Sequence, residues 1–229
     1  MLTNTIKRNA FRVLATLAFA AAPAFANMIL VNNPSFEQLG GELTSGCSGA
    51  CLIWVAPANG ALPGGWNSTV QRGGQLQPVG SPGYISKDFG DTGAWSNDGI
   101  YSQTVGAVAV VVGTPYMLRV DIGEKFGDTG FGGSADLLIG GAACATCIAG
   151  FTSGPPAAGG WATYMVMYTG LAADAGKSIT IELQNIHSGV YQANFDNVRM
   201  DTVPEPASFL LIGSALLALK AFRRRRPIA

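Results

Sequence analysis

The chain has 229 residues, enough for one domain with short appended segments, and its 14 basic and 14 acidic residues cancel. Eight of the basic residues lie within the first 12 or the last 10 positions, whereas residues 27–202 hold six basic and 13 acidic residues. This central part therefore has a net charge of −7. Such a charge argues against binding to nucleic-acid phosphates, which needs clustered Lys and Arg.

The N-terminal segment has the three parts of a secretory signal peptide. A basic stretch, MLTNTIKRNAFR, precedes the apolar run VLATLAFAAA, and Ala24-Phe25-Ala26 forms an A-x-A cleavage site. We expect residues 1–26 to be removed, so that the mature chain starts at Asn27. An uncleaved membrane anchor is the alternative.

Four cysteines form two close pairs, Cys47 with Cys51 and Cys144 with Cys147. An exported chain meets an oxidising compartment, which favours disulfides over a zinc site. Three connectivities are compatible with the sequence, and we favour two local bridges, Cys47–Cys51 and Cys144–Cys147. No thioredoxin-like pattern surrounds Cys144, which argues against a redox-active pair.

The central part contains short runs in which apolar and polar residues alternate. YMLRVDIG places Tyr116, Leu118, Val120 and Ile122 on one face, and SITIELQ does the same with Ile179, Ile181 and Leu183. No central segment has a sustained helical period with caps. Many short strands separated by Gly and Pro predict an all-β fold, a β-sandwich or jelly roll, over residues 27–202.

Long Gly- and Pro-rich segments separate these runs, among them residues 72–83 and 90–99, and we expect them to be loops. Such loops often carry binding residues. Sugar rings stack on aromatic side chains while amide and acidic groups bind the hydroxyls. The candidate ligand-binding residues are Trp95, Tyr84, Asn97 and Asp98. Packing beneath a loop is an equal alternative for each aromatic ring, and the more probable role for Trp66 and Trp161.

Two motifs near the ends of the central part carry a family resemblance. The opening segment reads ILVNNPSFE, with GW at Trp66 downstream, and the closing segment reads ANFDNVRM. Together with the central IYSQTVGAVAVVVGTPYMLRVDIG, they resemble the galactose-binding-like jelly rolls, which include several families of carbohydrate-binding modules. The termini of a compact sandwich commonly lie together, so we expect the first and last strands to pair in one sheet.

The same resemblance implies a structural calcium ion near Glu37 and Asp196. Carboxylate and carbonyl oxygens at loop–strand junctions suit Ca²⁺, and export into a calcium-containing medium permits it. Capping of turns or pairing with Lys or Arg is the alternative for both acids.

No catalytic residue can be named from the sequence. The single histidine, His187, lies in the loop-like QNIHSGVY, and no nucleophile elbow is present. Some cyanobacterial indole-alkaloid cyclases resemble the same jelly roll and use an aspartate as general acid. That precedent keeps an enzyme open as an alternative, although we expect a non-catalytic protein.

The C-terminal segment, residues 203–229, has three parts. Pro204-Glu205-Pro206 precedes an apolar run, Ala207–Phe222, and then four arginines, Arg223, Arg224, Arg225 and Arg226. A run of 16 residues is short for a membrane-spanning helix, which usually needs about 20. The arrangement resembles the PEP-CTERM sorting signal of Gram-negative bacteria. It implies transient insertion in the inner membrane, removal of the tail by an exosortase, and a producer of exopolysaccharide or biofilm.

These observations predict an exported protein of the cell surface or extracellular matrix with one jelly-roll domain. We expect this domain to bind extracellular polysaccharide. A structural spacer that self-associates is the second hypothesis, and an enzyme on the jelly-roll scaffold, cyclase-like or hydrolytic, is the third.

Overall fold

The computed structural model describes residues 26–40, 50–54, 61–70, 72–78, 85–128, 130–186 and 191–203. Within these, Asn27–Val203 form one compact unit. The predicted signal peptide and sorting tail lie outside the described residues, as do Tyr84 and His187. In the part of the chain that is described, no helix is both long and apolar enough to cross a membrane.

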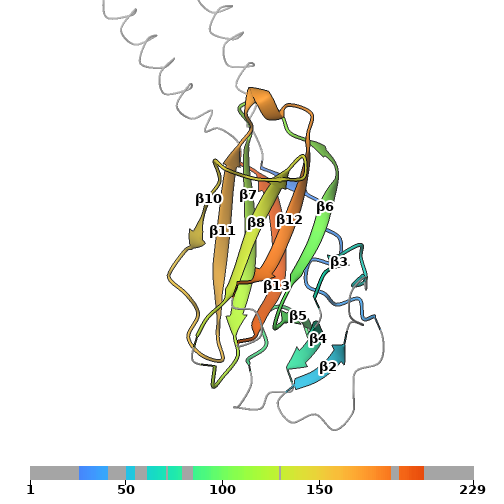
Figure 1. Cartoon of the computed structure of the whole chain (residues 1–229), viewed down its shortest axis with the longest axis vertical. Coiled ribbons are helices and arrows are strands. Elements are labelled where there is room, and N and C mark those ends of the chain that lie inside the picture. The colour runs from blue at the N-terminus through green and yellow to red at the C-terminus, as the bar shows by residue number, and fades with distance from the viewer. Residues whose placement is uncertain are drawn as a thin grey trace, which may run out of the picture. The chain divides into compact units, whose positions relative to one another are not determined.

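The described strands form two antiparallel sheets packed as a β-sandwich (Figure 1). One sheet contains eight strands, and β1 (Asn27–Ile29) pairs with its strand β13. The order of the other strands in that sheet is β10 (Ile148–Phe151), β11 (Trp161–Thr169), β7 (Pro115–Glu124), β13 (Ala193–Thr202), β5 (Gly93–Ser96), β4 (Gly73–Pro78) and β2 (Ala50–Trp54).

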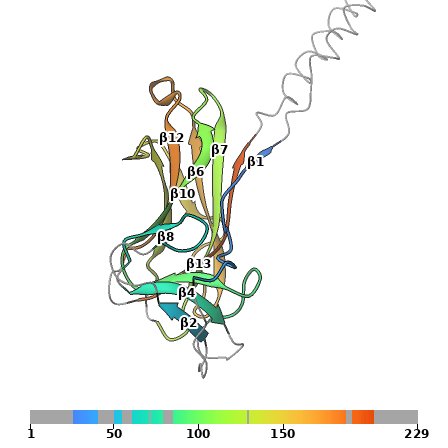
Figure 2. The same ribbon diagram turned by 90° about the vertical axis from the view of Figure 1, so that its right-hand side faces the viewer.

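The second sheet has five strands, and one 3-10 turn, η1 (Ala172–Asp174), connects β11 to β12. Figure 2 shows β2 and β4 crossing one end of the sandwich. The order in the second sheet is β3 (Asn67–Ser68), β6 (Ile100–Ala109), β12 (Ser178–Asn185), β8 (Gly133–Ile139) and β9 (Ala142–Ala143). The all-β jelly-roll prediction is confirmed.

The core forms where the alternating strands of the two sheets face each other. Leu118, Val120 and Ile122 of β7 are fully buried, as are Ile179 and Ile181 of β12. Successive side chains of a strand point to opposite faces, so the apolar positions of both strands meet between the sheets. The predicted inward faces of these two strands are therefore confirmed.

The first and last strands pair as predicted. Asn27 lies opposite Thr202 and Ile29 opposite Met200 in the antiparallel register of β1 with β13. Phe36 and Phe195, from the two terminal motifs, are completely buried. Both ends of the domain therefore leave the sandwich from the same edge.

Two segments that the sequence predicts as loops contain strands. Residues 73–78 form β4 and residues 93–96 form β5, and both extend the eight-stranded sheet beyond β13. The glycines that suggested turns permit close packing instead. A Cβ at Gly73 would lie only 2.3 Å from Val70 Cγ1 and 2.5 Å from the Tyr101 hydroxyl. Glycine inside a strand often marks such a close approach.

The predicted bridge between Cys144 and Cys147 is present, and both residues pack against the main core. Cys47 lies outside the described residues, so the Cys47–Cys51 bridge stays a prediction.

Candidate functional site

Trp95 lies in strand β5 and does not form an exposed aromatic platform. Trp95 is only 2% exposed, because β5 packs its ring with Leu76 and Ile85 in a small second apolar cluster, against which Trp161 also lies. The ring therefore packs beneath loop 85–92, which is the alternative that the sequence left open for it. Trp66 is completely buried, as the packing alternative predicts.

Of the polar neighbours of Trp95, Asp98 is engaged through its side chain and Asn97 through its backbone, whereas the buried Asn97 Oδ1 has no hydrogen-bond partner among the described residues. Asp98 accepts the backbone N–H of Arg72 at 3.0 Å, and its second carboxylate oxygen lies 3.5 Å from Arg72 Nε. The backbone N–H of Asn97 donates to the Arg72 carbonyl at 2.8 Å. A ligand-binding role for Asn97 and Asp98 stays a prediction.

Loop 85–92 brings Glu37 and Asp196 together. Glu37 Oε1 accepts the backbone N–H groups of Asp91 and Thr92 at 2.7 and 3.0 Å. Asp196 Oδ2 accepts the backbone N–H of Phe89 at 3.1 Å. The two acids named from the terminal motifs therefore hold one and the same loop against β13.

A glycine lets this loop approach so closely. Gly90 has a φ of +68°, and a Cβ built there would lie 2.1 Å from Glu37 Oε1. Only a residue without a side chain fits this contact and adopts this left-handed backbone without strain.

Asp196 lies on the outer face of the eight-stranded sheet, opposite Asp121 of β7. The register between these strands shifts after Asp196, where Asn197 has a φ of 48°. Such a bulge re-aims the neighbouring side chains. Here the Asn197 backbone N–H donates to Asp196 Oδ1 at 2.6 Å, and the Asn197 side chain donates to Asp121 Oδ2 at 2.7 Å.

A third acid, Asp88, joins this group from loop 85–92. Its carboxyl group hydrogen-bonds the carboxyl of Asp121, which also accepts Thr163 Oγ1 at 2.6 Å and lies 3.4 Å from an Arg199 nitrogen. The negative charge of Asp121 therefore opposes the ionisation of Asp88, while the cation Arg199 favours it. The sequence did not single out Asp88, because the pairing depends on where the loop crosses the sheet.

Trp161 forms the wall beside these acids. Its indole N–H donates to the Ser86 carbonyl at 2.9 Å, which fixes the ring against the loop. Gly123, opposite Trp161 in the register of β7 with β11, leaves the space for the ring: a Cβ at Gly123 would lie 2.8 Å from two indole carbons. The sequence predicted only packing or a loop seal for Trp161.

The proximity of these acids, together with burial, changes their acidity. The pKa of Asp196 is raised to about 8, first by burial and also by the negative charges of Asp88 and Glu37, against the lowering effect of the backbone hydrogen bonds from Phe89 and Asn197. The pKa of Asp88 is raised to about 6, first by partial burial and then by the charge and hydrogen bond of Asp121, with Arg199 opposing. Asp196 is therefore mostly protonated at pH 7.

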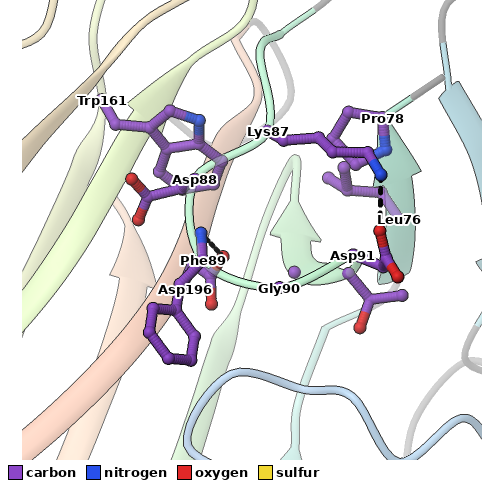
Figure 3. A pocket seen from close by; sticks show the side chains of 11 residues that line it. Leu76, Pro78, Lys87, Asp88, Phe89, Gly90, Asp91, Trp161 and Asp196 are labelled. Atoms are coloured by element: carbon purple, nitrogen blue, oxygen red, sulfur yellow. Dashed lines mark hydrogen bonds and ion pairs between the residues drawn. The ribbon is translucent and has the colours of Figure 1, made fainter. Parts of the chain in front are cut away.

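These groups line a small hollow between loop 85–92 and the outer face of the sheet (Figure 3). Its empty volume is about 180 Å³, part of which is open solvent. In Figure 3, Trp161, Asp88 and Asp196 lie on one side, and the Lys87–Asp91 ion pair, 2.5 Å long, lies on the other. The lining residues are Leu76, Pro78, Lys87, Asp88, Phe89, Gly90, Asp91, Thr92, Gly93, Trp161 and Asp196.

A comparison with protein families matches residues 27–201 to the HpiC1-like family, described as HpiC1 cyclase. The chain belongs to this family. Residues 202–226 match the PEP-CTERM protein-sorting motif, so the predicted sorting signal is confirmed. This motif signals export and sorting to the envelope of Gram-negative bacteria, with processing by an exosortase.

Solved structures of other proteins show the same fold. A cyclase from Fischerella sp. TAU is 20% identical, with a TM-score of 0.58 over 79% of this chain and 98% of the cyclase. The Stig cyclase Fisc from the same organism, in complex with (3Z)-3-(1-methyl-2-pyrrolidinylidene)-3H-indole, is 19% identical, with a TM-score of 0.57 over 79% and 99% of the two chains.

The CBM22-1 xylan-binding domain of Paenibacillus barcinonensis Xyn10C is 14% identical. Its TM-score is 0.41 over 80% of this chain and 99% of that domain, a likeness too low to carry an argument about function. A comparison with curated protein sequences found no match.

Proposed function

We propose that this HpiC1-like protein is a non-catalytic surface or matrix protein that binds a sugar unit of extracellular polysaccharide in the hollow beside loop 85–92. The observation that carries the proposal is the pairing of an indole ring, Trp161, with the carboxyl groups of Asp88 and Asp196 in one hollow. Sugars are recognised by this combination of an apolar face and polar groups that bind hydroxyls.

The hollow is a shallow depression rather than an enclosed pocket, because it has no interior space that would hold even a water molecule. A ligand would therefore lie across the hollow, in the way that a single sugar unit at the end or on a branch of a polysaccharide stacks on an indole face.

The protonation states also suit a polyol. A protonated Asp196 offers a hydroxyl donor, and an ionised Asp88 offers acceptors above its pKa of about 6. Hydroxyl groups of sugars both donate and accept, so one neutral and one ionised carboxyl serve them together.

The test is a glycan array, combined with a pull-down on exopolysaccharide from the producing organism, using residues 27–203. We expect binding that Trp161→Ala reduces at least tenfold and that Phe126→Ala, an exposed aromatic outside the hollow, leaves unchanged. No binding to any glycan would remove the proposal and leave a structural spacer. Equal losses in both variants would place the site elsewhere.

A second candidate function is acid catalysis by Asp196, which its raised pKa of about 8 and membership of a cyclase family favour. An acid that stays protonated at neutral pH can donate a proton to a substrate. A Fischerella cyclase that is 20% identical to this chain, with a TM-score of 0.56, was crystallised in complex with 4-(1H-indol-3-yl)butan-2-one. Saturable binding of that compound, lost in Trp161→Ala, together with a product lost in Asp196→Asn, would support catalysis over sugar binding.

Calcium at Glu37 and Asp196 stays a proposal. The two carboxylates lie at the same loop, but among the described residues no three His, Cys, Asp or Glu side chains form a metal-binding group. Backbone carbonyl oxygens would have to complete the 6–8 ligands that Ca²⁺ takes. The ion would also require an ionised Asp196, so calcium and the protonated acid exclude each other.

We further propose that the tail, residues 203–229, inserts transiently in the inner membrane through Ala207–Phe222. After exosortase cleavage the mature domain would remain at the cell surface or in the matrix. The sorting motif at residues 202–226 supports this course.

A further inference from the structure

One end of the sandwich gathers loops of no net charge and exposed aliphatic side chains. This end, called the apolar tip here, consists of residues 110–114, 140–143 and 170–177. Val111, Val112 and Leu171 are 60%, 54% and 42% exposed. Backbone hydrogen bonds fix the first and third loops to each other, from Gly113 N–H to the Gly170 carbonyl at 2.8 Å and from Gly176 N–H to the Val110 carbonyl at 2.9 Å.

The apolar tip differs in charge from the rest of the domain. Its sequences VVVGT, GGAA and GLAADAGK contain one acid and one base, Asp174 and Lys177, whose ion pair measures 2.8 Å. The tip therefore has no net charge, whereas residues 27–202 have a net charge of −7.

The domain also ends at this tip. The backbone N–H of Val203 donates to the carbonyl of Pro115, the residue that follows the first tip loop, at 2.9 Å. Thr202 lies opposite Tyr116 and Asn27 opposite Thr202, so both ends of the domain leave near the start of β7, beside the first tip loop.

The sequence leaves little distance between the tip and the apolar tail. Only Pro204, Glu205 and Pro206 separate Val203 from Ala207. Even a fully extended chain covers at most about 14 Å over these four steps. Whenever Ala207–Phe222 is in the bilayer, Val203 is held close to the lipid headgroups.

We propose that the apolar tip is a membrane-resting surface that contacts the phospholipid bilayer while the sorting tail is inserted. Val111, Val112 and Leu171 would enter the headgroup region, where aliphatic side chains gain by leaving water. Because the tip has no net charge, an anionic bilayer repels it less than it repels the acidic remainder of the domain. The partner of the tip is therefore lipid, and the tail that would hold the domain at the bilayer continues from Val203.

This contact sets the orientation of the domain before cleavage. β7 runs from Pro115 at the tip to Glu124 at the opposite end, and Trp161 lies opposite Gly123 near that far end. The hollow beside loop 85–92 would therefore face away from the membrane, toward the surrounding matrix. The tip would also hold the cleavage region at one depth and one orientation for the sorting enzyme.

The experiment uses the full chain in vesicles of phosphatidylethanolamine and phosphatidylglycerol. Photo-crosslinking p-benzoylphenylalanine is placed at position 112, with controls at positions 126 and 186, where Phe126 and Ile186 are as exposed but lie at the opposite end. We expect lipid adducts, counted by mass spectrometry, at least fivefold more abundant at position 112. Similar yields at all three positions would overturn the proposal.

A pair of substitutions tests the tip without a label. The double variant Val112→Asp, Leu171→Asp should reduce the protection of residues 110–114 from hydrogen exchange in vesicles. The control double variant Phe126→Asp, Ile186→Asp should leave that protection unchanged. Each variant is first required to keep the parent's urea midpoint. If position 112 formed adducts in cells with a membrane protein instead of lipid, the tip would bind a protein partner, and the proposal would be overturned.

Discussion

Replacing Asp196 with asparagine removes a buried group that changes its charge close to neutral pH. Asp196 is 2% exposed, and its pKa is about 8 because burial and the charges of Asp88 and Glu37 oppose ionisation. Asparagine has nearly the same shape and stays neutral at every pH. The substitution therefore isolates the effect of titrating this one side chain.

The sign of the effect follows from the two pKa values. An aspartate in the unfolded chain has a pKa near 3.9, whereas folded Asp196 has one of about 8. Between these pH values the folded state binds more protons than the unfolded state, so the free energy of unfolding decreases as the pH rises. The contribution of protonated Asp196 is fully present below about pH 4 and is lost as the pH rises through 8. One proton corresponds to about 1.4 kcal/mol per pH unit.

Between pH 5 and pH 8 the wild-type protein should therefore lose up to about 4 kcal/mol through Asp196 alone. Asp196→Asn lacks this loss, but its amide nitrogen cannot accept one of the backbone N–H bonds from Phe89 or Asn197, which costs about 1 kcal/mol. We expect the variant to match wild type within about 1 kcal/mol at pH 5 and to be more stable by about 4 kcal/mol at pH 9.

The assay is urea unfolding of residues 27–203, followed by tryptophan fluorescence at pH 5, 6, 7, 8 and 9. Asp201→Asn is the matched control, because Asp201 lies on the same strand in a part-exposed ion pair with Arg119 at 3.3 Å. It should cost at most about 1 kcal/mol with no change of sign. A constant difference between Asp196→Asn and wild type across this range would refute the raised pKa.

Three further predictions concern the same domain. Gly123→Ala should displace the Trp161 ring and destabilise the domain by about 1–3 kcal/mol in urea unfolding. It should also weaken the binding of any ligand to the hollow. Gly141→Ala, where no atom lies near the added Cβ, should lack the steric effect on Trp161. Calcium should raise the melting temperature at pH 9 but not at pH 6, because Asp196 must ionise to bind it; equal shifts at both pH values would argue against Asp196 as ligand. Replacing Cys144 and Cys147 together with serine should cost about 2 kcal/mol, since the bridge closes a loop of four residues, and an unchanged urea midpoint would contradict this.

Much of the fold could be predicted from the sequence because burial imposes a period on a strand. The alternation in YMLRVDIG and SITIELQ placed β7 and β12 with their inner faces correctly. The same rule fails where glycine replaces the alternating side chain. In β4 and β5, Gly73 and Gly93 provide room for other parts of the chain, which a local reading cannot distinguish from a turn.

The candidate site was predictable only in part. Glu37 and Asp196 belong to the two terminal motifs. The pairing of β1 with β13 brings these two motifs to the same sheet. Asp88 and Trp161 depend on the register of β11, β7 and β13 and on the bulge at Asn197, which no local pattern encodes. A polar sequence around Trp95 suggested exposure, but loop 85–92 covers that outer face of the sheet and buries the ring.

Two surfaces at opposite ends of the sandwich would then have separate roles. The apolar tip lies beside the start of the sorting tail, whereas the hollow lies near the far ends of β7 and β13. If both proposals hold, the tip matters before cleavage and the hollow after it. Variants at Val112 and at Trp161 should therefore affect different steps and combine additively.

The most direct test of sugar binding at the hollow is an NMR titration of residues 27–203 with oligosaccharides from the producer's exopolysaccharide. The signals to follow are the Trp161 indole N–H and the Asp196 carboxyl carbon. We predict that both shift together and saturate, and that Asp196 titrates near pH 8 in the free protein. Unmoved Trp161 and Asp196 signals at saturating sugar, or shifts confined to other residues, would contradict the account.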